Sequence, residues 1–158
     1  MERHVLPGLT LREIGAAEDG ALRALFYETV HTVCAADYTA EELDAWAPRD
    51  YDCAAWGRTL RARCTLAAET EGVLAGFGNI GTDGYLDLLY VGWAFQGRGV
   101  GTALCDALEG LYDVPRVTVC ASRTARPFFA GRGYRLVRAQ QVERRGVTLE
   151  NFLMEKEL

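Results

Sequence analysis

Three glycines stand within six positions, at Gly97, Gly99 and Gly101, between an apolar run and a segment with apolar side chains at helical spacing. Because glycine has no Cβ atom, a ligand can approach the backbone closely there. A helix that begins after such a turn directs its unpaired N–H groups and the positive end of its dipole at the glycines, which suits phosphate. Residues 96–101 are therefore predicted to bind phosphate, and a purely structural turn is the alternative.

Two familiar phosphate motifs do not fit this turn. A dinucleotide fingerprint needs a third glycine in G-x-G-x-x-G, where this chain has Thr102, and no acidic residue follows at the end of a second strand to bind a ribose. A P-loop needs Lys and then Ser or Thr after its last glycine. Gly92 and Gly97 have the P-loop spacing, but Arg98 and Gly99 follow them. The pattern therefore indicates a different phosphate ligand.

The spelling Q-x-x-G-x-G, after a run ending in L-Y-V, resembles the acetyl-coenzyme A signature [RQ]-x-x-G-x-[GA] of the GNAT N-acetyltransferase superfamily. A later segment, A-R-P-F-F-A-G-R-G-Y at 125–134, resembles the superfamily pattern A-x-x-F-Y-x-x-x-G-F. With the order of elements, the resemblance covers about residues 9–157. Tyr38, Glu42, Ala45 and Trp46 also follow a spacing, Y-x-x-x-E-x-x-A-W, that is similar to a bacterial branch of uncharacterised members.

The resemblance implies that acetyl-CoA is the co-substrate and that its acetyl group passes directly to a primary amine of a small molecule or peptide. A backbone N–H near the end of the fourth strand would polarise the thioester carbonyl, and that strand would splay from the fifth to admit the ligand. A non-catalytic acyl-CoA-binding or sensor module is the main alternative, and a different acyl donor or an O-acceptor is a weaker one. The residues that the resemblance assigns to the coenzyme are Leu89, Tyr90, Val91, Gln96, Gly97, Arg98, Gly99, Val100, Gly101, Thr102, Ser122, Arg126 and Phe129.

Amine acetylation needs a general base, and Asp87 is the first candidate because it is the only ionisable side chain within the apolar fourth strand. Strand alternation predicts that it shares a face with Tyr85 and Leu89. Burial would raise its pKa toward a useful value unless an arginine pairs with it, and both interpretations are open. His31 is the second candidate, because it lies on the first predicted helix, which helps to wall the acceptor site in the superfamily.

The general acid is where the sequence departs from the pattern that it resembles. Many superfamily members carry a tyrosine near the coenzyme sulfur at the position of Phe129, which cannot donate a proton. Tyr134, five residues later, is one substitute, and water is another. Tyr38 and Trp46 are candidates for lining the acceptor pocket, although an aromatic pair at helical spacing also suits a core.

The composition predicts one globular domain, residues 1–158. Its net charge of −5 argues against a nucleic-acid partner, because such proteins carry basic patches. No apolar run approaches the ~20 residues of a membrane span and no signal peptide is visible, so we expect a cytoplasmic protein. Five cysteines without a C-x-x-C pair, and only two histidines, predict buried thiols and no metal site.

Hydrophobic periodicity predicts alternating strands and helices. Strands are expected at 9–14, 64–69, 73–80, 85–91, 116–121, 134–143 and 148–155, with helices at 17–36, 54–63, 102–109, 126–131 and directly after Thr39. Thr39 and Glu42 match a capping box, and 71–72, 82–84 and 145–146 match hairpin turns. The order is that of the GNAT superfamily: an α/β fold with a mixed, mostly antiparallel sheet, helices on both faces and a splay between strands four and five. The final strand could pair with a second subunit, which leaves a homodimer open.

Overall fold

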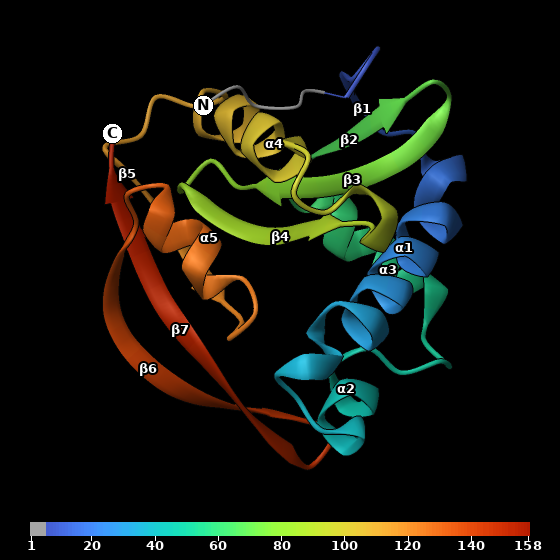
Figure 1. Cartoon of the computed structure of the whole chain (residues 1–158), viewed down its shortest axis with the longest axis vertical. Coiled ribbons are helices and arrows are strands. Elements are labelled where there is room, and N and C mark those ends of the chain that lie inside the picture. Colours follow the sequence, from blue (N-terminus) through green and yellow to red (C-terminus); the bar gives the residue numbers. More distant parts are fainter. Residues whose placement is uncertain (1–5) are drawn as a thin grey trace.

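A seven-stranded sheet forms the centre of the computed structural model, which describes residues 6–158 (Figure 1). Its strand order is β1-β2-β3-β4-β5-β7-β6, and only the β4–β5 pair is parallel. The sheet is therefore mixed and mostly antiparallel, as the sequence predicts. The strands are β1 (Thr10–Glu13), β2 (Cys64–Thr70), β3 (Val73–Ile80), β4 (Tyr85–Val91), β5 (Arg116–Ala121), β6 (Arg135–Arg144) and β7 (Val147–Glu157).

Helices cover both faces of the sheet, which confirms the predicted fold class. On one face, α1 (Asp19–Thr32), α2 (Ala40–Trp46) and α3 (Cys53–Arg61) bury side chains in one hydrophobic cluster. On the other face, α4 (Val100–Glu109) and α5 (Arg126–Gly131) bury theirs in a second cluster. No helix within residues 6–158 has both the length and the apolar character needed to span a membrane.

Local sequence signals explain two of the sheet's connections. Glu71 and Gly72 join β2 to β3 with φ values of 50° and 79°, and Arg145 and Gly146 join β6 to β7 with 50° and 77°. Positive φ at two consecutive residues is the signature of a type I′ turn, whose twist matches that of the flanking strands. Both hairpin turns lie where the sequence predicts them.

The ends of the helices follow the sequence less closely than their centres. The capping box before α2 is confirmed, since the Glu42 N–H donates to Thr39 Oγ1 at 3.2 Å and the Thr39 N–H donates to Glu42 Oε1 at 2.9 Å. The first helix is shorter than predicted, because 3-10 turns at Ala16–Glu18 and Cys34–Ala36 flank α1. The helix after the glycine turn begins at Val100, two residues earlier than predicted.

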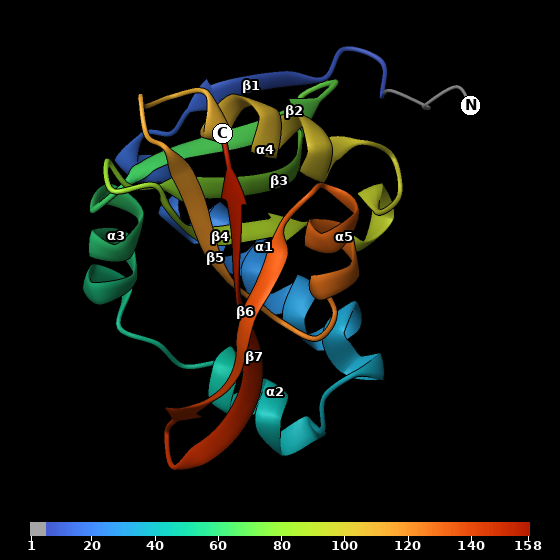
Figure 2. The same ribbon diagram turned by 90° about the vertical axis from the view of Figure 1, so that its left-hand side faces the viewer.

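The final strand lies inside the sheet and not at its edge. β7 pairs with β5 along one side and with β6 along the other, and β6 is the outer strand. Figure 2 shows β6 and β7 as a long hairpin whose turn lies beside α2. β7 pairs with β6 from Val147 to Glu155 but with β5 only from Phe152 to Glu157, so pairing of the final strand with a second subunit stays a prediction.

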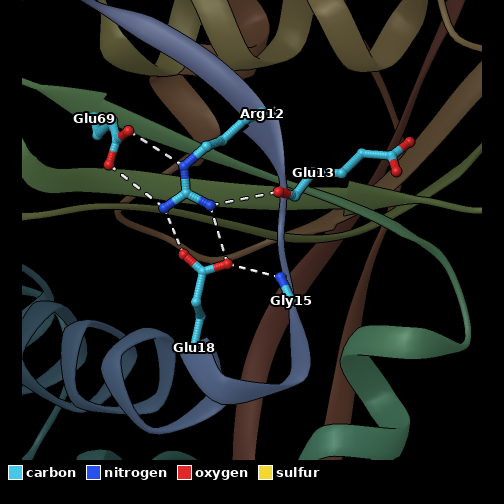
Figure 3. Close-up of polar contacts among 5 residues, drawn as sticks. All are labelled: Arg12, Glu13, Gly15, Glu18 and Glu69. Carbon is cyan, nitrogen blue, oxygen red and sulfur yellow. Dashed lines mark hydrogen bonds and ion pairs between the residues drawn. The ribbon is translucent and has the colours of Figure 1, made fainter.

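An ionic network fixes the start of α1 against the first two strands (Figure 3). The Arg12 guanidinium on β1 bonds the carboxylate of Glu18, and its Nε lies 3.2 Å from Glu69 Oε1 on β2. The Gly15 N–H also donates to Glu18 Oε2 at 2.7 Å. The bonds from Arg12 and then Gly15 lower the pKa of Glu18 to about 2. Because the network is largely exposed, we assign it a positioning role and not a large share of stability.

The cysteines are less uniformly buried than the sequence predicts. Cys34 and Cys105 are buried, Cys64 and Cys120 are half-buried, and Cys53 is exposed. All five are free thiols. Burial raises the pKa of Cys105 to about 12, so this thiol stays protonated at neutral pH. Within residues 6–158, no three His, Cys, Asp or Glu side chains are arranged to hold a metal ion.

Candidate active site

β4 pairs with β5 only through its first two residues, opposite the middle of β5, and the two strands then separate. Their register consists of Tyr85 with Thr118 and Leu86 with Val119. Gly84 makes the close start possible: the Thr118 N–H donates to its carbonyl at 3.0 Å, and a Cβ at this position would lie 2.5 Å from the Arg116 carbonyl oxygen. Beyond Leu86 the rest of β4 has no ladder partner on the β5 side, so the splay predicted between these strands is confirmed.

The first cavity, which we call the splay cleft, lies where the two strands have separated and has a volume of about 560 Å³. The structure brings eleven of the thirteen predicted coenzyme residues to its walls; these are Leu89, Tyr90, Val91, Gln96, Gly97, Arg98, Gly99, Val100, Gly101, Thr102 and Ser122. They come from β4, from the glycine turn with the first turn of α4, and from the segment after β5. One cavity thus joins segments that lie far apart in the chain.

The end of β4 offers backbone donors to the splay cleft. The N–H groups of Leu88 and Gly92 point toward β3, where they bond the Asn79 side chain at 3.0 Å and the Ala75 carbonyl at 2.8 Å. Since backbone groups alternate along a strand, the N–H groups of Leu89 and Val91 point the other way, toward the cleft. These donors are suited to an acceptor atom of a ligand that takes the place of the missing strand.

The glycine turn has a conformation that few other residues would adopt. Gly97 and Gly99 have φ values of 71° and 85°, in the left-handed region. The first helical bond of α4 runs from the Ala103 N–H to the Gly99 carbonyl at 3.0 Å, so the N–H groups before Ala103 have no partner within the helix. The Gln96 amide also donates to the Val91 carbonyl at 2.6 Å, which ties the turn to the end of β4. The unpaired N–H groups at the start of α4 are therefore suited to bind an anion.

The second cavity, which we call the aromatic cavity, has a volume of about 540 Å³ and lies next to the first. Trp46, Tyr90 and Ser122 line both cavities, so these three residues mark the junction. Tyr38 lines the aromatic cavity and packs edge-on against Trp46, with ring centroids 5.4 Å apart. The Tyr38 hydroxyl is engaged, because it donates to the Glu150 carbonyl at 2.9 Å.

Asp87 lies at the wall of the aromatic cavity and is half-buried. Its Oδ2 is 3.3 Å from Arg63 Nη1. Burial raises the pKa of Asp87, and the positive charges of Arg63 and Arg144 oppose that rise without cancelling it. The geometry thus combines the two interpretations that the sequence left open: an arginine partner is present, and the carboxyl group still lines a cavity with a raised pKa.

A β-bulge changes which side chains share a face of β4. The register between β3 and β4 moves from Asn79 opposite Leu88 to Ile80 opposite Leu86, which leaves Asp87 as an extra residue. Asp87 and Leu88 consequently line the same cavity, whereas Leu89 lines the splay cleft. The predicted common face of Asp87 and Leu89 is wrong, because simple alternation does not continue through a bulge. The bulge thus places the Asp87 carboxylate at the aromatic cavity and the unpaired backbone at the end of β4 at the splay cleft.

His31 does not line either cavity. Its Nε2 lies 2.8 Å from the Ala47 carbonyl oxygen, and its ring packs on Tyr27 with centroids 4.2 Å apart. The side chain therefore holds the end of α1 to the segment after α2. The expectation of a catalytic role for His31 is corrected, because Nε2 donates to a carbonyl and Nδ1 lies 3.9 Å from Asp44 Oδ1, so neither ring nitrogen faces a cavity.

Tyr134 and Phe129 lie in the core. Tyr134 is 4% exposed, and its hydroxyl donates to Glu109 Oε2 at 2.6 Å. Phe129 is 2% exposed and packs edge-on against the Tyr134 ring. Arg126 lies over the Phe152 ring, 4.4 Å from its centroid. Tyr134 and Phe129 line neither cavity, so the proton-donor role of Tyr134 and the coenzyme contact of Phe129 are corrected. Arg126 is exposed and directly follows Ala125, which lines the splay cleft, so its coenzyme contact stays a prediction.

Replacement of Tyr134 by Phe is expected to affect stability and not catalysis. The variant loses one hydrogen bond to a carboxylate, which contributes about 1.5–3 kcal/mol, while Glu109 keeps its bonds from Arg132 at 2.9 Å and Lys156 at 3.2 Å. Chemical denaturation would measure the loss in the free energy of unfolding. A large fall in kcat with unchanged stability would contradict the structural role.

The remaining residues of the splay cleft were missed by sequence reasoning. They are Thr29, Val33, Cys34, Phe95, Thr124, Ala125 and Phe128. Thr29, Val33 and Cys34 come from the end of α1 and the turn after it, and nothing in their spacing points to a ligand. Phe128 had a signal, because it is the first aromatic of the F-F pair. The structure directs this ring to the cleft and its neighbour Phe129 to the core.

The fold and the two adjoining cavities define the class of the protein, and comparison with known proteins agrees. A family model described as an acetyltransferase (GNAT) domain matches residues 34–158. The chain belongs to the GNAT N-acetyltransferase family of enzymes.

Individual relatives support this assignment. An uncharacterised N-acetyltransferase of Escherichia coli K12, YafP, is 32% identical over 133 residues, which cover 84% of this chain and 85% of YafP. A GCN5-related N-acetyltransferase structure from Rhodopseudomonas palustris is 35% identical, has a TM-score of 0.93 and covers 99% of this chain and 100% of its own. The PaiA N-acetyltransferase of Thermoplasma acidophilum, solved in complex with coenzyme A, is 16% identical with a TM-score of 0.73, over 96% of this chain and 99% of that one. PaiA thus shares the fold.

Proposed function

We propose that this chain, acting as one domain, transfers the acetyl group of acetyl-CoA directly to a primary amine of a small molecule. The observation that carries the proposal is the junction of the two cavities at Trp46, Tyr90 and Ser122. One cavity has anion-binding and strand-like backbone donors, and the other has a carboxyl group with a raised pKa. A thioester and an amine that enter from opposite sides would meet at this junction.

The backbone N–H donors of the splay cleft suit the phosphates and the pantetheine arm of acetyl-CoA. The glycine turn and the first N–H groups of α4 would hold the phosphates. The N–H groups of Leu89 and Val91 would bond the amide and thioester oxygens of the pantetheine arm, which takes the place of the strand that β4 lacks beyond Leu86. A bond from one of these N–H groups to the thioester oxygen stabilises the negative charge that develops there during attack.

Asp87 is assigned the role of general base. Ionised Asp87 takes a proton from the acceptor ammonium, directly or through water, and the free amine attacks the thioester carbonyl. The new C–N bond forms, the C–S bond breaks, the attacking nitrogen releases its second proton to solvent, and coenzyme A leaves as a thiolate. The Ser122 hydroxyl accepts a bond from the Ala125 N–H at 3.0 Å, which leaves its own proton free to bond the thiolate, and solvent supplies the final proton. This arrangement needs no tyrosine at position 129.

Acetyl-CoA is expected to bind saturably, one molecule per chain, whereas ATP and NADH do not bind with comparable affinity, because the turn lacks the residues of both of their motifs. Calorimetric titration of the purified protein measures all three ligands. Coenzyme A release with a panel of primary amines then measures turnover. A folded protein that does not bind acetyl-CoA would refute the proposal, and binding without turnover on any amine would restrict the site to coenzyme recognition.

A further inference from the structure

Arg23 on α1 is a deeply buried cation at the wall of the aromatic cavity. It is 4% exposed, and its guanidinium lies 5.1, 4.1 and 5.5 Å from the ring centroids of Phe26, Tyr51 and Trp56. Its Nη2 donates to the Pro48 carbonyl at 2.6 Å. Within residues 6–158, no ion pair joins it to an Asp or Glu. A charge this deeply buried is expensive unless a partner of opposite charge offsets it.

A second arginine adds to the charge at this end of the cavity. Arg145, in the turn between β6 and β7, donates from Nη1 to the Ala45 carbonyl at 2.8 Å and lines the same cavity. Burial lowers the pKa of Arg23, and the positive charge of Arg145 acts in the same direction, so the two guanidinium groups repel each other. Both hydrogen-bond to carbonyl oxygens, which accept hydrogen bonds but do not neutralise charge.

The carboxylates of the cavity wall are engaged elsewhere. Asp52 caps α3 by accepting the Ala55 N–H at 3.0 Å, Asp87 pairs with Arg63, and Glu150 Oε1 lies 3.0 Å from Arg123 Nε. Three arginines and three carboxylates line the cavity, but among residues 6–158 no carboxylate pairs with Arg23 or Arg145. Two neighbouring guanidinium groups without a carboxylate partner favour an anionic ligand at that place.

Aromatic rings also line the cavity that Arg23 and Asp87 share. Phe26 stacks on Trp56 with centroids 5.0 Å apart and meets Tyr90 edge-on at 4.8 Å. Arg23 contacts the first two of these rings, whereas the charges that act on Asp87 are those of Arg63 and Arg144. A ligand that contacts both Arg23 and Asp87 in this cavity would meet these rings, which suit a flat or apolar body. Trp56 Nε1 is buried with no hydrogen-bond partner in the described chain, which leaves a further donor beside the arginine.

We propose that the acceptor is an amino carboxylate: its carboxylate binds Arg23 and Arg145, its apolar body lies along the aromatic rings, and its amine reaches Asp87. The inference rests on the proposed function, because it names the substrate class of the same site. Arg23 is then a specificity residue, since it selects among amines without taking part in acetyl transfer. Its planar guanidinium matches a carboxylate, which can accept two parallel N–H bonds.

A matched pair of acceptors tests the inference. The 4-(aminomethyl)benzoate ion carries a carboxylate across a ring from its amine, and 4-methylbenzylamine has the same body without the charge. The wild-type enzyme is expected to show kcat/KM at least about 10-fold higher for the carboxylate, from charge-assisted hydrogen bonds. The corresponding phosphonate separates recognition of a carboxylate from that of any anion, and higher activity with the phosphonate would overturn the carboxylate assignment.

Arginine variants identify the residues responsible. Arg23→Gln is expected to lower the ratio of kcat/KM for 4-(aminomethyl)benzoate to kcat/KM for 4-methylbenzylamine to about one, and Arg23→Lys to retain part of that preference. Because Arg145 is exposed, Arg145→Gln should fold normally. We expect this variant to lose part of the preference for the carboxylate acceptor. Arg138→Gln, an exposed position on β6 outside both cavities, is the matched control. If the Arg23 and Arg145 variants lost kcat/KM equally for 4-(aminomethyl)benzoate and for 4-methylbenzylamine, the inference would be overturned.

A binding measurement separates this inference from the proposed function. The 4-methylbenzoate ion has no amine and cannot be acetylated. Calorimetry of the protein with coenzyme A present should detect its binding to the wild type and to Arg138→Gln, but not to Arg23→Gln. Turnover of amines without any preference for the carboxylate refutes the inference alone. Binding of 4-methylbenzoate that depends on Arg23, in a protein that acetylates no amine, refutes the proposed function alone.

Discussion

Replacement of Asp87 by Asn is expected to lower kcat/KM for amine acetylation by roughly 10²–10⁴-fold, the usual contribution of a general base. The amide keeps the size of the carboxyl group but cannot accept the proton. Because Asp87 lines the aromatic cavity and not the splay cleft, the affinity for acetyl-CoA should not change. Steady-state kinetics and calorimetry on the same variant measure both quantities. A variant with normal turnover would remove Asp87 from the mechanism.

The pH dependence of the reaction provides an independent readout. Since burial raises the pKa of Asp87, the rate should rise with pH through a value above that of an ordinary carboxyl group. Arg63 opposes this rise, so Arg63→Gln should move the acidic limb of the pH profile to still higher pH while the plateau remains. An acidic limb at the same pH in both proteins would show that another group titrates.

The raised pKa of Asp87 also affects the stability of the fold. A carboxyl group whose pKa is higher in the folded state than in the unfolded state favours folding when it is protonated, and this contribution is lost as the pH rises through the folded-state pKa. Above its folded-state pKa, the ionised Asp87 carboxylate is less favourable in the folded chain than in the unfolded chain. Asp87→Asn should therefore raise the free energy of unfolding at a pH above the acidic limb of the rate profile, and the gain should shrink at low pH. An inactive variant that is also more stable is expected of a functional residue and not of a structural ion pair.

Those parts of the fold that depend on neighbouring residues could be predicted from the sequence. The turns at Glu71–Gly72 and Arg145–Gly146 and the capping box of Thr39 with Glu42 each need only a few residues, and each lies where the pattern puts it. The glycine turn belongs to the same group, because the spacing of its glycines and the helix that follows specify an anion-binding start.

Other features depend on contacts between distant segments, and the sequence does not reveal them. The bulge at Asp87 arises from the register of β4 on β3, so strand alternation misassigned Leu89. The Tyr134 hydroxyl bonds Glu109 on a helix 25 residues earlier, a contact with no local signal. Arg23 is one of several arginines in the chain, and its importance becomes visible only when α1, α3 and the β6–β7 turn surround it. Local patterns thus locate the glycine turn at the splay cleft, whereas the aromatic cavity is a product of tertiary structure.

Replacement of Gly101 by Asp is expected to weaken acetyl-CoA binding by at least about 100-fold, because it places a negative charge where the phosphates are proposed to bind and like charges in contact cost several kcal/mol. Gly101 is in the first turn of α4 and does not have a positive φ, so the backbone tolerates a side chain. A Cβ atom there would lie 3.3 Å from the Phe128 ring, which also lines the splay cleft. Calorimetric titration with acetyl-CoA measures the loss.

Two further variants separate charge from shape. Gly101→Ala introduces the same Cβ contact with Phe128 without the charge, so it should lose only a small part of the affinity. Gly131→Asp adds the same carboxylate at an exposed glycine of α5 with open space around it, and it should bind acetyl-CoA like the wild type. Equal affinity in Gly101→Asp and Gly131→Asp would mean that the start of α4 does not hold the phosphates. A loss confined to Gly101→Asp would instead tie coenzyme binding to charge at this helix start, which is the property that the three glycines first indicated.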